Sequence, residues 1–342
     1  MKLLSKLFEF IGFTDNDTGS AVKTHIPANV LNEAIEHVVD AIDPNLRYFP
    51  GYKKVLTNSV ATSLAYISNL VDSIPEPVFI SRKDFFKDAR INAFFVTVAD
   101  MQDIFSNSIE LRSFLEATEN CNLNEAYALL CMTETEKTVL GMDLNEDIIQ
   151  REVLQTALDF SDHKILSPAA SEAEVRKGIK QCIFDGLITH ALQQILELKE
   201  HKKELEYQGC ILNSRLKTRQ SQGGGLSNLL VSATEKRLST DIKQKNIDNE
   251  EKLKKFPASW EAPRFYLEII KNTLSQPENF ICIQEKSFCL TKMRTVASEN
   301  TSQSVETIHF HQITIADVLE RVVAIVHYPR SEILPRREFK LK

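Results

Sequence analysis

Residues 159–164 bring together side chains that can perform acid–base or metal chemistry. Asp159, Asp162 and His163 stand close together in this stretch. An imidazole oriented by a carboxylate can act as a general base, and the same groups can ligate a metal ion. No GxSxG motif surrounds Ser161, however, and Asp, Ser and His are also common in ordinary turns. We therefore take Asp159, Asp162 and His163 as catalytic candidates, with a plain turn as the competing interpretation.

His309 and His311 form a second candidate site. On a strand, residues two apart face the same side, so both imidazoles can approach one metal ion. Such a site needs further ligands, and Cys282 and Cys289 stand in the same part of the chain. The six residues between these cysteines exceed the two to four of a zinc knuckle. His309 and His311 remain metal-binding candidates, with a solvated strand as the alternative, and we predict no cofactor.

Other chemical signatures are missing from the sequence. The triple glycine at 223–225 is followed by Leu226, Ser227 and Asn228. A phosphate-binding loop of the Walker type requires Lys-Ser/Thr at that place, so this loop is excluded. The six cysteines are scattered and form no CxxC pair, which is typical of reduced thiols in a cytoplasmic protein.

Composition narrows the class of protein further. The apolar share of 43% is that of a globular chain rather than a disordered one. The formal net charge of −6 gives no chain-wide basic surface, so we expect no nucleic-acid partner. The sequence contains no run of eighteen apolar residues, so we predict no membrane-spanning helix. Lys6 and Glu9 interrupt the apolar residues at the start, so we predict no secretory signal.

Residues 1–24 are predicted to be an amphipathic helix on a flexible tether. Apolar residues recur at helical spacing up to Ile11, and Leu4 and Phe8 are the interaction candidates among them. The polar residues 12–24 suit a tether. Such an end can dock on its own protein body, on a partner protein or, through residues 1–11, on a membrane surface.

Residues 25–170 are predicted to be a helical domain rich in phenylalanine, with a possible β-ribbon at 137–160. Apolar residues at helical spacing predict several helices, and residues 123–132 look like one more. Alternation around the turn-forming residues 145–147 indicates the ribbon. A helix through 148–158 is the rival interpretation.

Residues 171–256 are predicted to form a long helical hairpin that turns at 223–225. Ser171 and Glu174 make a capping box at its start. Its apolar seam alternates steps of three and four residues, as in a coiled coil, with faults at Lys202 and Gly209. The interaction candidates on this seam are Leu198, Leu205, Leu212 and Leu216. The alternative is that 221–256 is a disordered linker.

Residues 257–330 are predicted to be a small α+β domain, and 331–342 a basic tail. A helix should precede an antiparallel sheet of about four strands. Residues 317–327 are either the last strand or a helix. The fold class expected from the whole sequence is therefore mainly α, with a small α+β unit at the C-terminal end.

These features favour a protein-interaction or adaptor protein without catalytic activity. Its partner would be another protein, or a second copy of the chain, bound through the helical hairpin. The first alternative is a metal-dependent or hydrolytic enzyme that uses one of the two candidate clusters. The second is a peripheral membrane protein attached by its N-terminal helix. We expect a cytoplasmic location, with a membrane-peripheral position as the variant.

Overall fold

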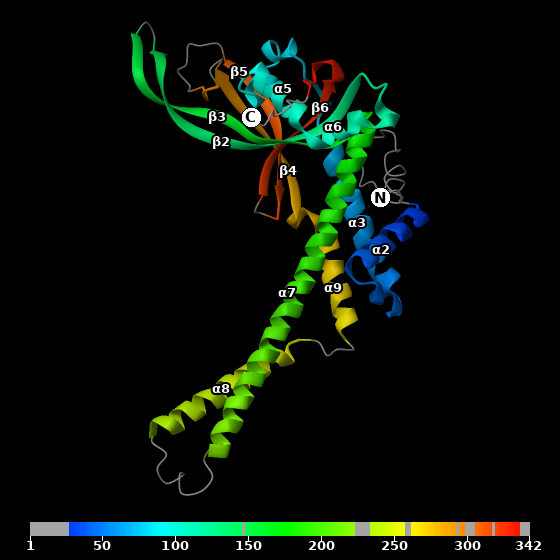
Figure 1. The fold of residues 1–342 in the computed structure, drawn as a ribbon, viewed down its shortest axis with the longest axis vertical. Helices are drawn as coiled ribbons and strands as arrows, with labels where there is room; N and C mark the ends of the chain where they lie inside the picture. The colour runs from blue at the N-terminus through cyan, green and yellow to red at the C-terminus, as the bar shows by residue number, and fades with distance from the viewer. Residues whose placement is uncertain are drawn as a thin grey trace, which may run out of the picture. The chain divides into compact units, whose positions relative to one another are not determined.

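The computed structural model describes residues 27–145, 148–222, 233–256, 261–291, 294–297, 305–316 and 319–335 (Figure 1). They form two compact units. The sheet unit is built mainly from Thr62–Asp185 and the described residues that follow Gln276. The helical unit comprises Leu31–Ala61 and the described residues between Gly186 and Ser275. Helices α3 (Tyr52–Asp72) and α7 (Glu172–Gln222) supply residues to both units.

The described residues of the sheet unit form six strands in one sheet. Five of them are antiparallel neighbours in the order β3-β2-β6-β5-β4. Their bounds are β2 (Glu125–Asn145), β3 (Ile148–Ala169), β4 (Ile281–Thr291), β5 (Val305–Ile315) and β6 (Leu319–Pro329). The short strand β1 (Val78–Phe79) pairs in parallel with β6.

This sheet contradicts the expected mainly helical fold with a small C-terminal α+β unit. The predicted ribbon at 137–160 is the outer part of the longer β2–β3 hairpin, and residues 125–132, expected to be helical, belong to β2. That inner part of β2 pairs with β6, for example Leu129 with Ile325. Of the two interpretations of 317–327, the strand is confirmed for the described residues, since β6 begins at Leu319. The prediction was wrong because local periodicity does not reveal a strand partner about two hundred residues away.

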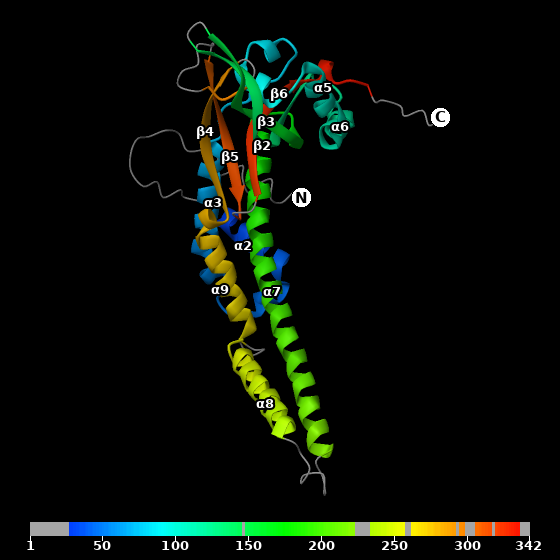
Figure 2. The same cartoon turned by 90° about the vertical axis from the view of Figure 1, so that its left-hand side faces the viewer.

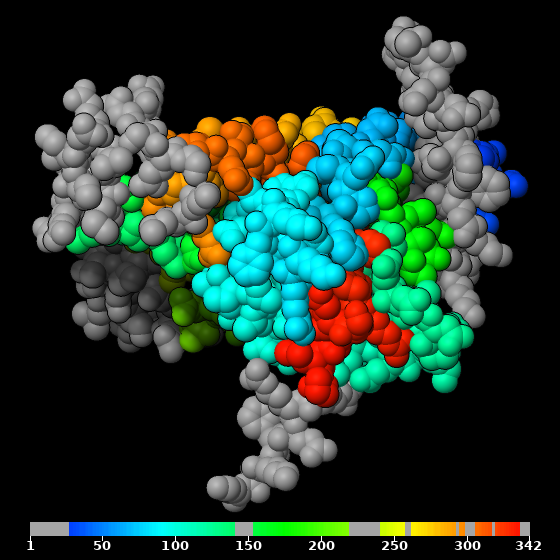
Figure 3. Space-filling view, turned by 90° about the horizontal axis from the view of Figure 1, so that it is seen from above, coloured from blue at the N-terminus to red at the C-terminus, as the bar shows by residue number. Residues whose placement is uncertain are grey.

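A short segment links the two outer strands of the sheet. Thr295 forms a bridge with Ala157 of β3, and Val296 forms one with Leu290 of β4. The sheet therefore curls until its outer strands approach each other at this point. The face with the large apolar core is covered by α4 (Ala89–Phe94), α5 (Val98–Asn107) and α6 (Ile109–Glu116). Figure 3 shows the cyan helical segment next to the red chain that follows β6.

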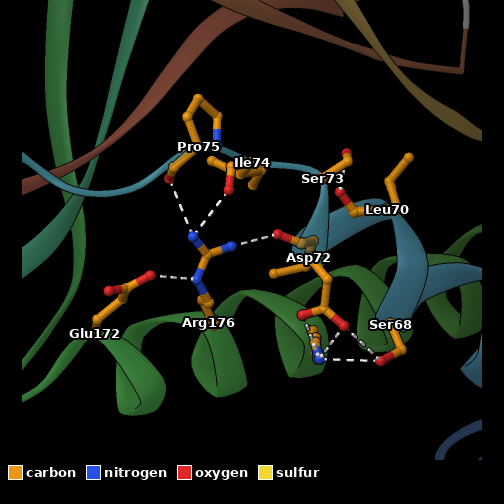
Figure 4. A network of polar contacts seen from close by, with 10 residues as sticks. Ser68, Leu70, Asp72, Ser73, Ile74, Pro75, Glu172 and Arg176 are labelled. Atoms are coloured by element: carbon orange, nitrogen blue, oxygen red, sulfur yellow. Dashed lines mark hydrogen bonds and ion pairs between the residues drawn. The ribbon is translucent and has the colours of Figure 1, made fainter. Parts of the chain in front are cut away.

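The C-terminal end of α3 is held by one arginine of α7 (Figure 4). Arg176 donates from Nη1 to the carbonyl oxygen of Val71 at 2.7 Å. Its Nη2 donates to the carbonyl oxygens of Ile74 and Pro75 at 2.8 and 3.0 Å. Its Nε donates to the carboxylate of Glu172 at 2.7 Å, which fixes the guanidinium. The carbonyls of Ile74 and Pro75 lie beyond the end of α3 and have no intrahelical donor, so this side chain supplies one. The carbonyl oxygen of Val71 also accepts from the backbone N–H of Ile74 at 3.2 Å.

The helical unit contains the predicted hairpin as α7 and α8 (Ala233–Lys254), beside α2 (Ala28–Ile42) and α9 (Ala262–Ser275). Asn249 donates from Nδ2 to the carbonyl oxygen of Leu205 at 2.8 Å, and Asn246 donates to Asn213 at 3.0 Å. Higher numbers on α8 meet lower numbers on α7, so the helices are antiparallel, as Figure 2 shows. The predicted turn at 223–225 lies outside the described residues.

Both ends of the chain lie outside the described residues as well. This applies to residues 1–26, with Leu4 and Phe8, and to residues 336–342 of the basic tail. Within the described ranges, no helix has both the length and the apolar character that crossing a membrane requires.

Candidate functional site

An open groove lies between α5–α6 and strand β3 in the sheet unit. Its volume is about 780 Å³. One wall is made by residues on α5 and at the start of α6, and the other by most of residues 159–166 of β3. Asp159 and His163, two of the three catalytic candidates, line this groove, whereas Asp162 does not. We call it the β3 groove.

A β-bulge in β3 separates the three candidates. Cys131 pairs with Lys164 and Thr133 with Ser161, so three steps along β3 match two along β2. Asp162 has a φ of 50° and is the extra residue. A bulge of this kind reverses which face the following side chains occupy. His163 therefore turns toward the covered face of the sheet, while Asp162 stays exposed.

His163 is held as a structural side chain. Its Nε2 lies 2.7 Å from the carbonyl oxygen of Phe94, so this nitrogen carries the proton and donates it. The ring stacks on Phe95 with 5.1 Å between centroids. Burial lowers the pKa of the imidazole below its ordinary value of 6.5, and the hydrogen bond to Phe94 opposes that shift. The neutral ring has only Nδ1 left to accept a proton.

Both carboxylates of the cluster are paired with cations. Asp159 lies 2.5 Å from Nζ of Lys137. Asp162 lies 2.7 Å from Nη2 of Arg321 and 3.5 Å from Nζ of Lys164. The hydrogen bond from Arg321 is the main reason why the pKa of Asp162 is lowered. These contacts bind the carboxylates to cations in place of the imidazole, so the geometry offers no Asp–His relay. The catalytic role remains a prediction from the sequence.

The β3 groove combines apolar surface with carboxylates. Ile109 is 81% exposed and Val96 is 58% exposed, and both line it. The charged lining residues are four acids and one base, namely Asp100, Asp103, Glu110, Asp159 and Lys164. An acidic groove with exposed apolar side chains suits a ligand that is both basic and apolar.

The metal-binding candidates His309 and His311 lie two residues apart on β5, which pairs with β4 on one side and β6 on the other. They pair with Ser287 and Glu285 respectively, and Nδ1 of His309 lies 3.4 Å from the carboxylate of Glu285. Burial lowers the pKa of His311. Within the described part of the chain, no three His, Cys, Asp or Glu side chains are grouped closely enough to hold a metal ion. The structure thus adds no further ligand there to this pair.

One hairpin candidate, Leu205, lies where α8 packs on α7, since its carbonyl oxygen accepts from Asn249 of α8. Leu205 is buried, and Leu198, Leu212 and Leu216 are half-buried. Gly209, expected to be a fault in the seam, is also buried. The interaction role of the four leucines stays a prediction from the sequence.

The exposed apolar side of α7 was missed. Leu196 is 48% exposed and Tyr207 is 67% exposed. Eleven residues separate them, which is about three helical turns, so they share one face. That face lies opposite Leu205. Tyr207 is two positions after Leu205, and two positions correspond to about 200° around the helix. The eleven-residue spacing was the available signal.

Comparison of the chain with protein-family models, with curated proteins and with solved structures found no match.

Proposed function

We propose that this chain is a protein-interaction protein that presents the back of the α7–α8 hairpin to a partner. The observation that carries the proposal is that the seam is closed within the chain, while Leu196 and Tyr207 stay exposed on the opposite face of α7. Exposed large side chains three turns apart on a rigid helix are suited to anchor a partner helix.

The rest of this helix supports a solvated, partner-facing role. Residues 197–206 are strongly charged, with Glu and Lys at helical spacing. A partner helix can therefore gain apolar contacts at Leu196 and Tyr207 and salt-sensitive contacts between them. The partner is another protein or a second copy of the chain. Six free cysteines fit a cytoplasmic location, which is part of the proposal.

The test replaces the two exposed side chains and leaves the seam untouched. The double variant Leu196→Ser, Tyr207→Ser should fold normally, because both residues are exposed. Tyr48→Ser is the matched control, since Tyr48 is 86% exposed in the same unit. Sedimentation equilibrium measures self-association as the mass in solution. Quantitative capture from native lysate measures the binding of other proteins.

We expect the double variant to lose either self-association or a set of captured proteins that the Tyr48 control retains. If mass in solution and captured proteins are the same for wild type, control and double variant, this face binds nothing and the proposal fails. A loss with Tyr48→Ser as well would point to general surface stickiness and would also contradict it.

A further inference from the structure

The outer edge of β3 is open along the β3 groove. β3 is the last strand in the sheet order and pairs with β2 on its inner side. On its outer side, among the described residues, only Thr295 forms a bridge with it, at Ala157, before the groove begins. Residues 159–166 therefore leave a strand edge facing the hollow. Such an edge is a template for another extended segment.

The walls of the groove specify what kind of segment fits. Ile109 and Val96 offer exposed apolar surface to one set of alternating side chains. Asp100, Asp103 and Glu110 attract cations. An extended segment with apolar residues two apart and basic residues around them would match both features, because side chains of a strand alternate between its faces.

The chain itself contains such a segment, and it begins close to the groove. Leu334 donates its backbone N–H to Oγ of Ser106 at 2.8 Å, and its carbonyl oxygen accepts from Arg112 at 2.9 Å. Ser106 is two residues before Ser108, which lines the groove. The remaining residues, 335–342, span up to about 26 Å when extended, enough to pass round the end of α5.

The composition of this segment matches the groove. Phe339 and Leu341 are two apart. Four cations surround them, Arg336, Arg337, Lys340 and Lys342, against one acid, Glu338. We propose that the end of this segment, residues 338–342, binds in the β3 groove as an added strand against part of residues 159–166, with residues 335–337 passing round the end of α5. This is a binding site distinct from the hairpin face, so it stands or falls separately from the proposed function.

The first experiment measures backbone hydrogen exchange in the full-length chain. In one variant the four tail cations are changed to Glu. The matched control changes four cations of α8 to Glu, namely Lys243, Lys245, Lys252 and Lys254. We expect amide exchange in 159–166 to accelerate about tenfold or more in the tail variant and to stay unchanged in the control. Raising the salt to about 0.5 M should accelerate exchange in the wild type in the same region.

A groove variant tests the other partner in the contact. Ile109→Lys removes exposed apolar surface and adds a repelling charge, whereas Tyr48→Lys makes the same kind of change on a comparably exposed residue outside the groove. Only Ile109→Lys should accelerate exchange in 159–166. Equal exchange in wild type and tail variant would overturn the proposal. Protection that rises with protein concentration would assign the site to the tail of a second copy and would also overturn it.

A binding assay separates specific docking from charge attraction. A fluorescein-labelled peptide of residues 335–342 is titrated with the tail variant, whose groove should be vacant. We expect binding about tenfold tighter than for the same peptide with Ser at Phe339 and Leu341, and about tenfold tighter than to the wild type, where the tail competes. Equal binding of the two peptides would show that the groove recognises charge alone, and the strand-addition proposal would then be wrong.

Discussion

Gly209 gives the sharpest test of how the helical hairpin is held together. A Cβ on this residue would stand 2.9 Å from Nδ2 of Asn249. That amide nitrogen donates to the carbonyl oxygen of Leu205 at 2.8 Å, and Asn249 is only 5% exposed. The change Gly209→Ala therefore cannot be accommodated unless the buried amide moves away from its acceptor.

Two opposing effects determine how Gly209→Ala changes the stability of the hairpin. Replacing Gly by Ala inside a helix normally stabilises the folded state by about 1 kcal/mol. Leaving the buried amide of Asn249 without its acceptor costs about 1–3 kcal/mol. We expect Gly209→Ala to destabilise the hairpin by about 0–2 kcal/mol as the sum of these two terms. In an Asn249→Ala background the second effect is absent, so the same change should stabilise by about 1 kcal/mol.

Hydrogen exchange of the full-length chain measures this locally, as the free energy of opening for peptides from α7 and α8. Gly178→Ala is the control on the same helix, because the nearest atom to its added Cβ would lie at 3.5 Å, an ordinary contact. The control should be neutral or stabilising. Gly209→Ala could instead stabilise the hairpin equally in the wild type and in the Asn249→Ala background. In that case Asn249 does not pack against Gly209, and the reasoning is refuted.

Two further outcomes follow from the sheet unit. Arg176→Ala should destabilise the unit by about 2–3 kcal/mol in chemical denaturation, because the carbonyls at the end of α3 lose a charged donor. The control Arg215→Ala, on the exposed surface of α7, should leave the free energy of unfolding nearly unchanged. Equal effects of the two variants would contradict the capping role. Burial lowers the pKa of His163 in the folded state. Below pH 6.5 this imidazole is therefore protonated in the unfolded state but stays neutral in the folded state, so the free energy of unfolding falls as the pH drops. His163→Gln keeps a donor for Phe94 and should lose less stability than the wild type between pH 7 and about 5; parallel stability curves would argue against a buried neutral imidazole.

The capping box at the start of α7 shows what local sequence can predict. Ser171 accepts from the N–H of Glu174 at 3.4 Å, and the Glu174 carboxylate reaches back to the N–H of Ala170 at 3.1 Å. These contacts join residues within one helical turn, so they depend on little besides neighbouring residues. The alternating steps of three and four along the seam are local in the same sense, and Leu205 on that seam is buried.

The candidate site was predictable only in part. The sequence placed Asp159, Asp162 and His163 together, and all three lie on β3. The bulge at Asp162 then directs His163 to the carbonyl oxygen of Phe94, while Arg321 of a distant strand binds Asp162. Neither contact can be predicted from the neighbouring residues. The bulge depends on how β3 pairs with β2, and Arg321 belongs to a strand about 160 residues further along the chain.

The sequence alone determined which residues of this protein form apolar faces: the seam of α7, the core residues of the N-terminal helices and the alternating strands near the C-terminal end. Only the tertiary structure decided what covers each face. It joined the ribbon to the C-terminal strands in one sheet and placed Asn249 against Gly209, which turned an apparent fault of the seam into a contact. The physical reason is that periodicity reports how a side chain points relative to its own helix or strand, whereas its partner is selected by shape, hydrogen bonding and charge across the folded chain.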